Sequence, residues 1–507
     1  MSGRDVVLGS FSSPMSSASS NAVAPPVGLV TKLFYGLGSV AFGIKDNGFQ
    51  TFILLFYSQL VGLPANWVGG AIFVALVVDA FMDPIVGQIS DQWRSKWGRR
   101  HPFMYFAALP VAISYVALWN PPHLTPQLTV VYLTVVAIVV RTFITFYEIP
   151  SSALAPELTE DYDERTAILG YRYMFGWLGG LGMTFLAFAV FLANTAKYPV
   201  GQLNPEGYSR YGLVSAVVMF FVIIISSAGT HRRIPYLRKP ATGPKRSMFA
   251  YVGEMLSTLS NRSFLMMLGV GLFTAMGQGL NFALSIYFAT WFWEFNSSQI
   301  LMLIAMGFAG AVVAMVLAPW LSRAFGKKPA ALVTLALGVI SVSSPILLRL
   351  AGLMPANHTP LLLPTLLAFG AFSSSLGISA SILISSMIAD VVEDSELKTG
   401  RRSEGLFFAA SAFVNKTVTG AGVFISGLVL TYVHFPTRAR PGHVPQDILD
   451  HLALTYIPAY AVLYGIAFLF MLGYRISRTS HHDNLRRLAD AASAAELVEE
   501  AGVTATH

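Results

Sequence analysis

The sequence contains no cysteine, which excludes disulfide bonds and thiolate metal sites. It is also poor in charge: Asp, Glu, Lys and Arg make up 12% of the 507 residues, about half of the roughly 25% found in soluble domains. Hydrophobic residues make up 54% of the chain. This composition indicates an integral membrane protein that crosses the bilayer several times.

Sequence motifs of common enzyme sites are missing too. The chain has no G-x-x-x-x-G-K-[ST] phosphate loop, no H-E-x-x-H zinc pair and no G-x-S-x-G nucleophile elbow. These absences disfavour ATP-driven transport and hydrolysis in the membrane, so we expect neither an enzyme nor a bound cofactor. The Ser- and Pro-rich stretch 1–28 has no long apolar core, and we expect a disordered cytoplasmic tail rather than a secretory signal.

Twelve segments are long and apolar enough to cross the hydrocarbon core, which takes about 20 residues of helix. They fall into six and six around a polar, proline-containing linker at 232–247. We therefore predict an all-α membrane protein with two six-helix bundles, 29–231 and 259–478, a cytoplasmic linker at 232–258 and a cytoplasmic tail at 479–507. The predicted spans are 29–61, 66–92, 102–121, 127–155, 166–196, 209–231, 259–295, 298–323, 329–352, 360–390, 402–434 and 450–476.

Lysine and arginine are distributed unevenly between the two sets of loops. One set holds most of them, including Arg99, Arg100 and Lys327, whereas the other set holds few. Basic loops are the cytoplasmic ones, so we expect both termini inside, in the plasma membrane and specifically a bacterial inner membrane. The net charge of +7 is then a topology signal, and no nucleic-acid partner is expected.

A weak internal repeat relates the two halves. The loop after the second span reads SDQWRSKWGRR (90–100), and the loop after the eighth reads LSRAFGKKPA (321–330). Both place a small residue and paired basic residues at a cytoplasmic turn. Repeated halves of this kind are typical of transporters that rock one half against the other.

Ionisable residues lie inside several predicted spans, where charge is costly and usually marks a substrate path, a proton relay or an ion pair. Acids and bases are balanced, so the cavity is expected to be near neutral before an ion binds. That suits a neutral polyol and does not exclude an anionic substrate. The residues are Lys45, Asp46, Asp79, Asp83, Arg141, Glu148, Arg172 and Lys416.

Asp79 and Asp83 are four residues apart, so they share one face of a helix about one turn apart. Two carboxylates at that spacing repel each other unless a cation lies between or beside them: a bound Na+, a shared proton, or a protein Lys or Arg. Thr145 could supply a hydroxyl ligand to Na+. We expect the pair to serve ion coupling; the alternative is a structural salt-bridge network with Lys416 or Arg141.

Asp91, Arg99 and Arg100 lie at the basic turn after the second span. Topology alone explains basic residues there. We also expect these three residues to form interhelical ion pairs that act as a cytoplasmic gate. Candidate partners around the loop after the tenth span are Asp390, Glu393, Asp394 and Glu404.

The run DAFMDPIVGQISDQWRSKWGRRHPF (79–103) resembles the D-x-x-x-D-P…G…(K/R)-W-G-(K/R) signature of the glycoside–pentoside–hexuronide:cation symporters, the melibiose-permease-like family of the major facilitator superfamily. The similarity extends to GIKDNG (43–48), YEIPSSALAPELTEDYDERT (147–166) and VNKTVTGAG (414–422). Together the motifs span nearly the whole chain, and the combination is specific although each motif alone is weak. The resemblance implies a major facilitator fold with twelve transmembrane helices.

The resemblance also implies roles for individual residues. Asp79 and Asp83 match the family's cation-binding acids, Thr145 matches a hydroxyl ligand, and Lys416 matches the lysine near those acids. For Arg172, which falls one residue from the family's arginine, a gate or a structural pair is the alternative to a substrate contact. The residues expected to bind substrate are Lys45, Asp46, Arg141, Glu148, Ser152 and Arg172.

Three positions depart from the family pattern. Met82 stands where the family has an asparagine directly before the second acid, and losing that amide oxygen favours H+, or a site with different ligands, over the family's Na+ site. Ser152 replaces the tryptophan that stacks on the sugar ring, which argues against a galactoside-like substrate. Arg141 replaces a small residue, and it either binds an anionic group of the substrate or fills space that Na+ would need.

We therefore expect a monomeric secondary active transporter that couples H+ or Na+ to the symport of a sugar or glycoside by alternating access. The loaded carrier, with both acids neutralised, should change between inward and outward states more easily than the half-loaded one. The alternative substrate is an amphiphile such as a lysolipid or sterol conjugate. The alternative of another class is a non-transporting membrane sensor.

Overall fold

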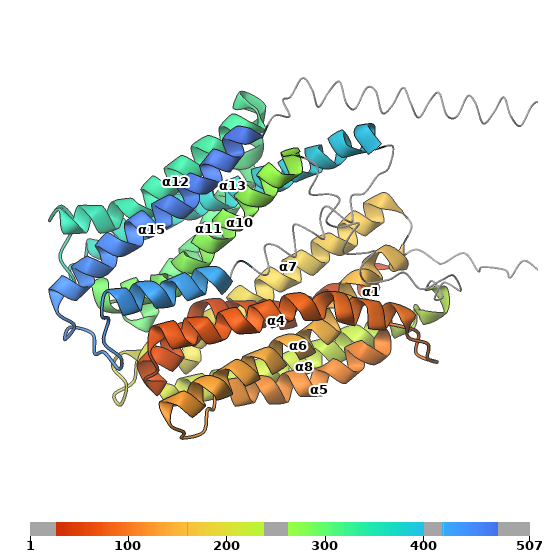
Figure 1. Cartoon of the computed structure of the whole chain (residues 1–507), viewed down its shortest axis with the longest axis horizontal. Coiled ribbons are helices and arrows are strands. Elements are labelled where there is room, and N and C mark those ends of the chain that lie inside the picture. Colours follow the sequence, from red (N-terminus) through yellow and green to blue (C-terminus); the bar gives the residue numbers. More distant parts are fainter. Residues whose placement is uncertain (1–26, 160, 238–261, 400–417, 419, 475–507) are drawn as a thin grey trace, which may run out of the picture.

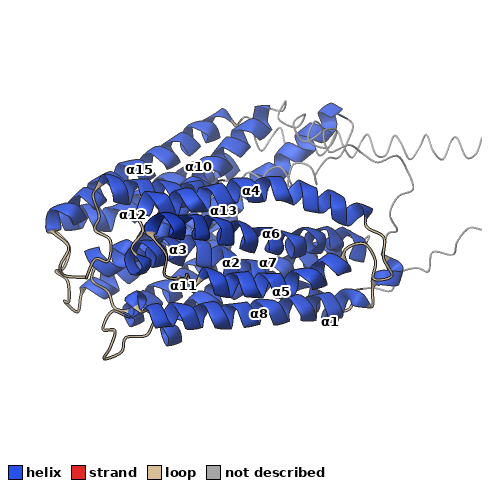
Figure 2. Cartoon of the chain, turned by 60° about the horizontal axis from the view of Figure 1, so that its bottom comes forward, coloured by secondary structure: helices blue, strands red, loops and turns tan. Residues whose placement is uncertain are grey.

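The computed structural model describes residues 27–159, 161–237, 262–399, 418 and 420–474. Every regular element in these ranges is a helix, and the long helices run in similar directions along the molecule (Figure 1, Figure 2). The prediction of an all-α membrane protein is confirmed for this part of the chain.

The first predicted span is a helical stretch that repeatedly changes type between Leu29 and Val61. Wide π-helical turns are rare and often occur at functional positions, and here one of them begins just after Lys45 and Asp46. Gly62 ends the stretch with a φ of 96°, a left-handed conformation that favours glycine. The elements are α1 (Leu29–Leu37), α2 (Ser39–Asn47), η1 (Gly48–Phe52), α3 (Ile53–Leu55) and η2 (Phe56–Val61).

Several of the remaining long helices begin at capping residues that the sequence supplies. Thr125 accepts a hydrogen bond from the backbone N–H of Leu128, and Asn204 does the same for Gly207. Asn296 and Gln299 form a reciprocal capping box. In the first half the elements are α4 (Ala65–Gln92), α5 (His101–Leu118), α6 (Pro126–Leu158), α7 (Tyr162–Leu186), η3 (Ala187–Phe191), η4 (Gly201–Leu203), α8 (Pro205–His231) and η5 (Ile234–Tyr236). In the second half they are α10 (Arg262–Tyr287), η6 (Phe288–Phe292), α11 (Ser297–Phe325), α12 (Lys327–Leu350), α13 (Leu362–Thr399) and α15 (Gln446–Gly473).

Ten helices in the described ranges are long and apolar enough to cross a membrane. A shorter apolar helix, Gly420–Tyr432, lies within the predicted span 402–434, and the stretch from Leu29 to Val61 corresponds to the first predicted span. The count of twelve spans and the cytoplasmic location of both termini stay predictions.

The helices form two bundles that follow the order of the chain. In Figure 1 the ribbons from α1 to α8 lie together, as do those from α10 to α15, and the two groups converge at one end and diverge toward the other. We call the end that carries the turns of Arg100 and Lys327 the basic face. The apolar core has the same asymmetry: one large cluster contains residues of both bundles, such as Tyr57 and Tyr287, whereas two smaller clusters each stay within one bundle.

The contacts between the bundles lie at the face opposite the basic face. Within the described ranges, many of the residues that form hydrogen bonds between the bundles belong to short elements next to the ends of the long helices, among them η2 and η4. η4 precedes the first residue of α8, whereas Arg232 and Arg233 follow its last, about 40 Å away for a helix of this length. We call this set of contacts the seam; its residues are Leu54, Ser58, Gln59, Val61, Asn66, Asn194, Gln202, Tyr287, Thr290, Phe295, Ser297, Thr431, Pro436, Arg438 and Ala439.

Gln202 makes three hydrogen bonds across the seam. It is fully buried, and its Nε2 donates to Thr290 Oγ1 at 3.1 Å and to the carbonyl of Phe295 at 3.0 Å. Its Oε1 accepts from Ser297 Oγ at 3.0 Å. All three partners belong to the second bundle, so these bonds exist only while the bundles are closed at this face. A buried amide that loses its partners is costly, and Gln202 therefore stabilises the closed seam.

We predict that Gln202→Ala opens the seam more often. Because the natural chain has no cysteine, Ser58→Cys gives a single reporter at a fully buried seam position. Loss of three hydrogen bonds should raise the rate of its labelling by a membrane-impermeant maleimide, added on the side opposite the basic face, by about tenfold. The exposed Gln127→Ala variant is the control and should leave the rate unchanged. An equal rate in both backgrounds would show that Gln202 does not hold the seam closed.

Candidate functional site

Four of the predicted residues meet between α4 and α6. Asp79 and Asp83 project from α4, and Arg141 and Thr145 from α6, so each helix contributes a pair spaced four residues apart. Pro84 follows the second acid inside α4. It has no N–H and therefore leaves one backbone carbonyl of the preceding turn without its helical donor.

Arg141 and Asp79 form a buried ion pair. Nε and Nη2 of Arg141 donate to the same carboxylate oxygen, Oδ2, at 3.1 and 2.8 Å. The two side chains are 4% and 2% exposed, and the guanidinium also lies 5.5 Å from the ring centre of Phe49. Burial of each charge alone is very unfavourable, so removal of either partner leaves an uncompensated charge in the membrane.

Thr145 connects the two acids. Its buried Oγ1 lies 2.8 Å from Oδ1 of Asp79 and 3.0 Å from Oδ1 of Asp83. A hydroxyl group has one proton and can donate to only one oxygen at a time. The second contact is a good hydrogen bond only if a carboxyl proton points at the hydroxyl oxygen. The arrangement therefore suits one proton shared by the two acids and Thr145.

The predicted substrate residues on α2 form a local pair. Lys45 Nζ lies 2.6 Å from Oδ1 of its neighbour Asp46. The lysine side chain is 1% exposed, whereas 42% of the aspartate side chain is accessible. The lysine thus neutralises the acid from the inside, and the accessible face of the Asp46 carboxylate can accept hydrogen bonds from a ligand.

Arg172 on α7 is held by protein groups. Its Nη1 donates to Ser151 Oγ at 3.2 Å, and its guanidinium lies 5.3 Å from the ring centre of Phe42 and 6.0 Å from that of Tyr35. The charge of Glu148 also acts on it. These contacts favour the structural alternative for Arg172, which joins α7 to α6, α2 and α1.

Of two further predicted site residues, Ser152 and Lys416, the structure describes only Ser152. Ser152 donates to the carbonyl of Ile149 on its own helix at 2.9 Å, so the serine at the family's tryptophan position is used within α6. Lys416 lies outside the described residues. The assignment of these side chains to cation or substrate stays a prediction.

The predicted gate residues do meet, around an acid that the sequence prediction missed. Arg99 and Arg100 both bind Glu157 near the end of α6. Asp91 lies 3.9 Å from Arg99 and 3.3 Å from Arg100. All four residues belong to the first bundle, so this cluster, which we call the first staple, ties α4, α5 and α6 together at the basic face.

The second bundle has an equivalent contact. Lys327, in the turn that repeats the one at Arg99, lies 2.6 Å from Asp390 of α13. We call this pair the second staple. Asp390 was a candidate partner of the first basic turn, and its observed partner is Lys327 within its own half. The side chains of the other three candidates, Glu393, Asp394 and Glu404, are outside the described structure. The internal repeat could have revealed Glu157, because it occupies in α6 the place of Asp390 in α13.

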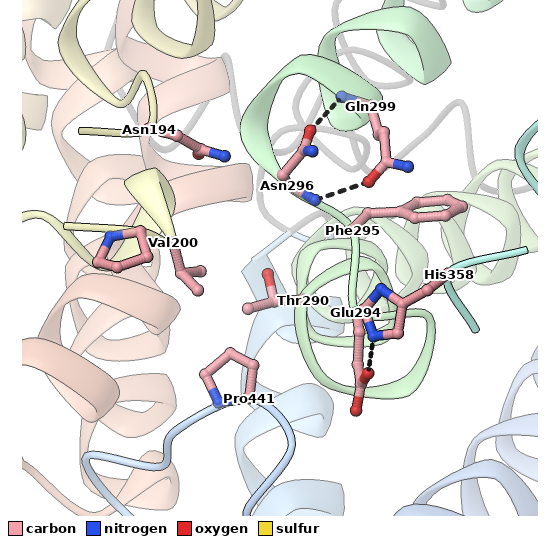
Figure 3. A pocket seen from close by; sticks show the side chains of 10 residues that line it. Asn194, Val200, Thr290, Glu294, Phe295, Asn296, Gln299, His358 and Pro441 are labelled. Carbon is pink, nitrogen blue, oxygen red and sulfur yellow. Dashed lines mark hydrogen bonds and ion pairs between the residues drawn. The ribbon is translucent and has the colours of Figure 1, made fainter. Parts of the chain in front are cut away.

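A cavity of about 410 Å³ lies beside the seam, away from the acid pair (Figure 3). Thr290, a partner of Gln202, is part of its wall, and Glu294 and His358 form a 2.8 Å hydrogen bond there. Both of these residues have positive φ angles, 53° and 64°, which are uncommon for side chains other than glycine. None of the predicted site residues lines this cavity.

Comparison with known proteins gives consistent results. The family described as MFS/sugar transport protein matches residues 34–478. An isoprimeverose transporter of Lactiplantibacillus pentosus is 24% identical, over 88% of each chain. A sodium-dependent lysophosphatidylcholine symporter of Xenopus tropicalis is also 24% identical, over 95% of this chain and 94% of the other. The crystal structure of a D-xylose-proton symporter has the same fold, with a TM-score of 0.58 at 14% identity over 88% of this chain and 98% of the other.

We predict that Glu157→Gln destabilises the protein. The substitution leaves Arg99 and Arg100 without their buried carboxylate, which should cost roughly 3 kcal/mol in the free energy of unfolding. The measurement is the melting temperature of the purified protein in detergent. Glu206→Gln is the matched control, since it breaks an exposed pair with Lys197 and should cost less than about 1 kcal/mol. Equal melting temperatures for the two variants would contradict a stabilising role for the first staple.

Proposed function

The chain belongs to the MFS/sugar transport protein family, and on that premise we propose that it is a secondary active transporter that couples a cation to the symport of a sugar or glycoside. It is an integral membrane transporter with the major facilitator fold and is not an enzyme. The observation that carries the proposal is the buried cluster of Asp79, Asp83, Arg141 and Thr145 between α4 and α6. Its charges are placed where a movable cation changes the net charge of a membrane-embedded site.

Coupling follows from the cost of moving charge through a closed state. Arg141 pairs with Asp79, and we expect a coupling ion that binds at Asp83 to bring the site near neutral. The neutral site can be occluded when the bundles rearrange, whereas the charged site resists occlusion. The contact of Thr145 with both acids supports H+ as this ion.

The proposal of a sugar substrate is supported by Asp46, because the accessible face of its carboxylate can accept hydrogen bonds from the hydroxyl groups of a ligand. The family description and the isoprimeverose-transporting relative point the same way. A lysolipid or similar amphiphile is the second candidate, because the lysophosphatidylcholine symporter of Xenopus tropicalis is equally similar over a larger share of the chain. Ser152 at the position of the family's tryptophan also fits a substrate that does not stack as a sugar ring does.

We predict that Asp83→Asn abolishes accumulation driven by an ion gradient. The variant side chain cannot change its charge, so the carrier should still exchange labelled for unlabelled substrate without concentrating it. The measurement compares gradient-driven uptake with counterflow in proteoliposomes. Asp447→Asn, at an exposed position on α15, is the control and should keep both activities. Full accumulation by Asp83→Asn would refute the coupling role of Asp83.

We predict that Asp46→Asn weakens the binding of a sugar substrate. A radiolabelled panel of sugars, glycosides and lysolipids in proteoliposomes first identifies the substrate. If a sugar is bound through its hydroxyl groups, loss of the charged acceptor should raise KM by about tenfold or more. Uptake of lysolipids but of no sugar by the unaltered protein would exclude the first candidate. A sugar KM that Asp46→Asn leaves unchanged would remove Asp46 from the binding site.

A further inference from the structure

Sodium is the coupling ion named for one relative of this chain, so the acid pair must be tested for its fit to Na+. Na+ needs several oxygen ligands around one point. Oδ2 of Asp79 already receives two N–H groups of Arg141, and Oδ1 receives the hydroxyl of Thr145. Met82, directly before the second acid, offers a thioether in place of an oxygen. The donor set at Asp79 therefore does not fit Na+.

The position of Arg141 adds electrostatic repulsion to this poor fit. A guanidinium keeps its proton under all physiological conditions and has no acceptor atom. A Na+ ion in contact with the Asp79 carboxylate would lie next to this permanent positive charge in a region of low dielectric constant, where repulsion is strong. Burial of the Arg141 side chain, its two bonds to Oδ2 and the nearby ring of Phe49 hold the guanidinium in place.

We propose that Arg141 is a tethered counter-ion that takes the place of Na+ at Asp79, so that the protein does not bind Na+ at its acid pair. The inference rests on the proposed function only in assigning the cluster to ion coupling. It makes Arg141 the residue that determines ion specificity. A chain of this family with a small residue in its place has room for a free cation at the same carboxylate.

The test measures Na+ binding directly, without substrate. The melting temperature of the purified protein in detergent is compared in NaCl and in choline chloride of equal ionic strength. The unaltered protein and Arg141→Lys, which keeps the tethered charge, should show no difference. Arg141→Ala removes the guanidinium from Asp79 and opens space beside the carboxylate, so Na+ should stabilise this variant by about 3 °C or more. In the double variant Asp79→Asn with Arg141→Ala the carboxylate is gone as well, and the Na+ effect should disappear.

Two results overturn the inference. One is a higher melting temperature of the unaltered protein in NaCl than in choline chloride, if this difference is lost in the Asp79→Asn variant. The other is an Arg141→Ala variant that folds but has the same melting temperature in NaCl and in choline chloride. If Arg141→Ala does not fold, Arg141→Gln provides the same test, because its amide can still donate to Asp79 but carries no charge. Failure of the transport proposal has a different signature, namely no uptake driven by any ion gradient, and the melting experiment is independent of it.

Discussion

Charge inside the bilayer must be balanced locally, and the contact of Arg141 with Asp79 is the clearest instance in this protein. The pair fixes α4 and α6 relative to each other, because neither side chain can leave without exposing the other to hydrocarbon. Thr145 and Asp83 are positioned by the same two helices. The proposed ion site thus lies within one bundle, and a rigid-body movement of the bundles would carry it as a unit.

The two faces of the molecule are stabilised in different ways. At the basic face each bundle has its own staple, Arg99 and Arg100 with Glu157 in the first and Lys327 with Asp390 in the second. At the opposite face the seam joins the bundles through contacts such as those of Gln202. Each bundle is thus held together by its own ion pairs at the basic face, and hydrogen bonds join the two bundles at the opposite face. This arrangement suits a rigid-body rocking of one bundle against the other.

Much of this organisation could be predicted from the sequence, because long apolar segments and charges inside them are visible in one dimension. The acid pair and Thr145 were placed together correctly through helical spacing and family resemblance. The partner of Asp79 was left open between Lys416 and Arg141, since spacing does not say which cation lies nearest. Glu157 and Gln202 were missed because an acid near a helix end and an amide in a loop look ordinary until packing encloses them. Arg172 and Ser151 lie on different helices, and only the three-dimensional structure shows their bond.

Pro84 has a mechanical consequence for the proposed coupling site. It lies inside α4 directly after Asp83, and because it has no N–H the helix lacks one backbone hydrogen bond between the turn of Asp79 and the turn of Asp91. Asp91 touches the first staple, whereas Asp79 is fixed to α6. Each half of α4 is thus held by α6 or by the turn before α5, and the position with the missing backbone hydrogen bond lies between these two attachments. Asp83 is the acid beside this weaker position, so a change in its charge acts where the backbone of α4 is least constrained.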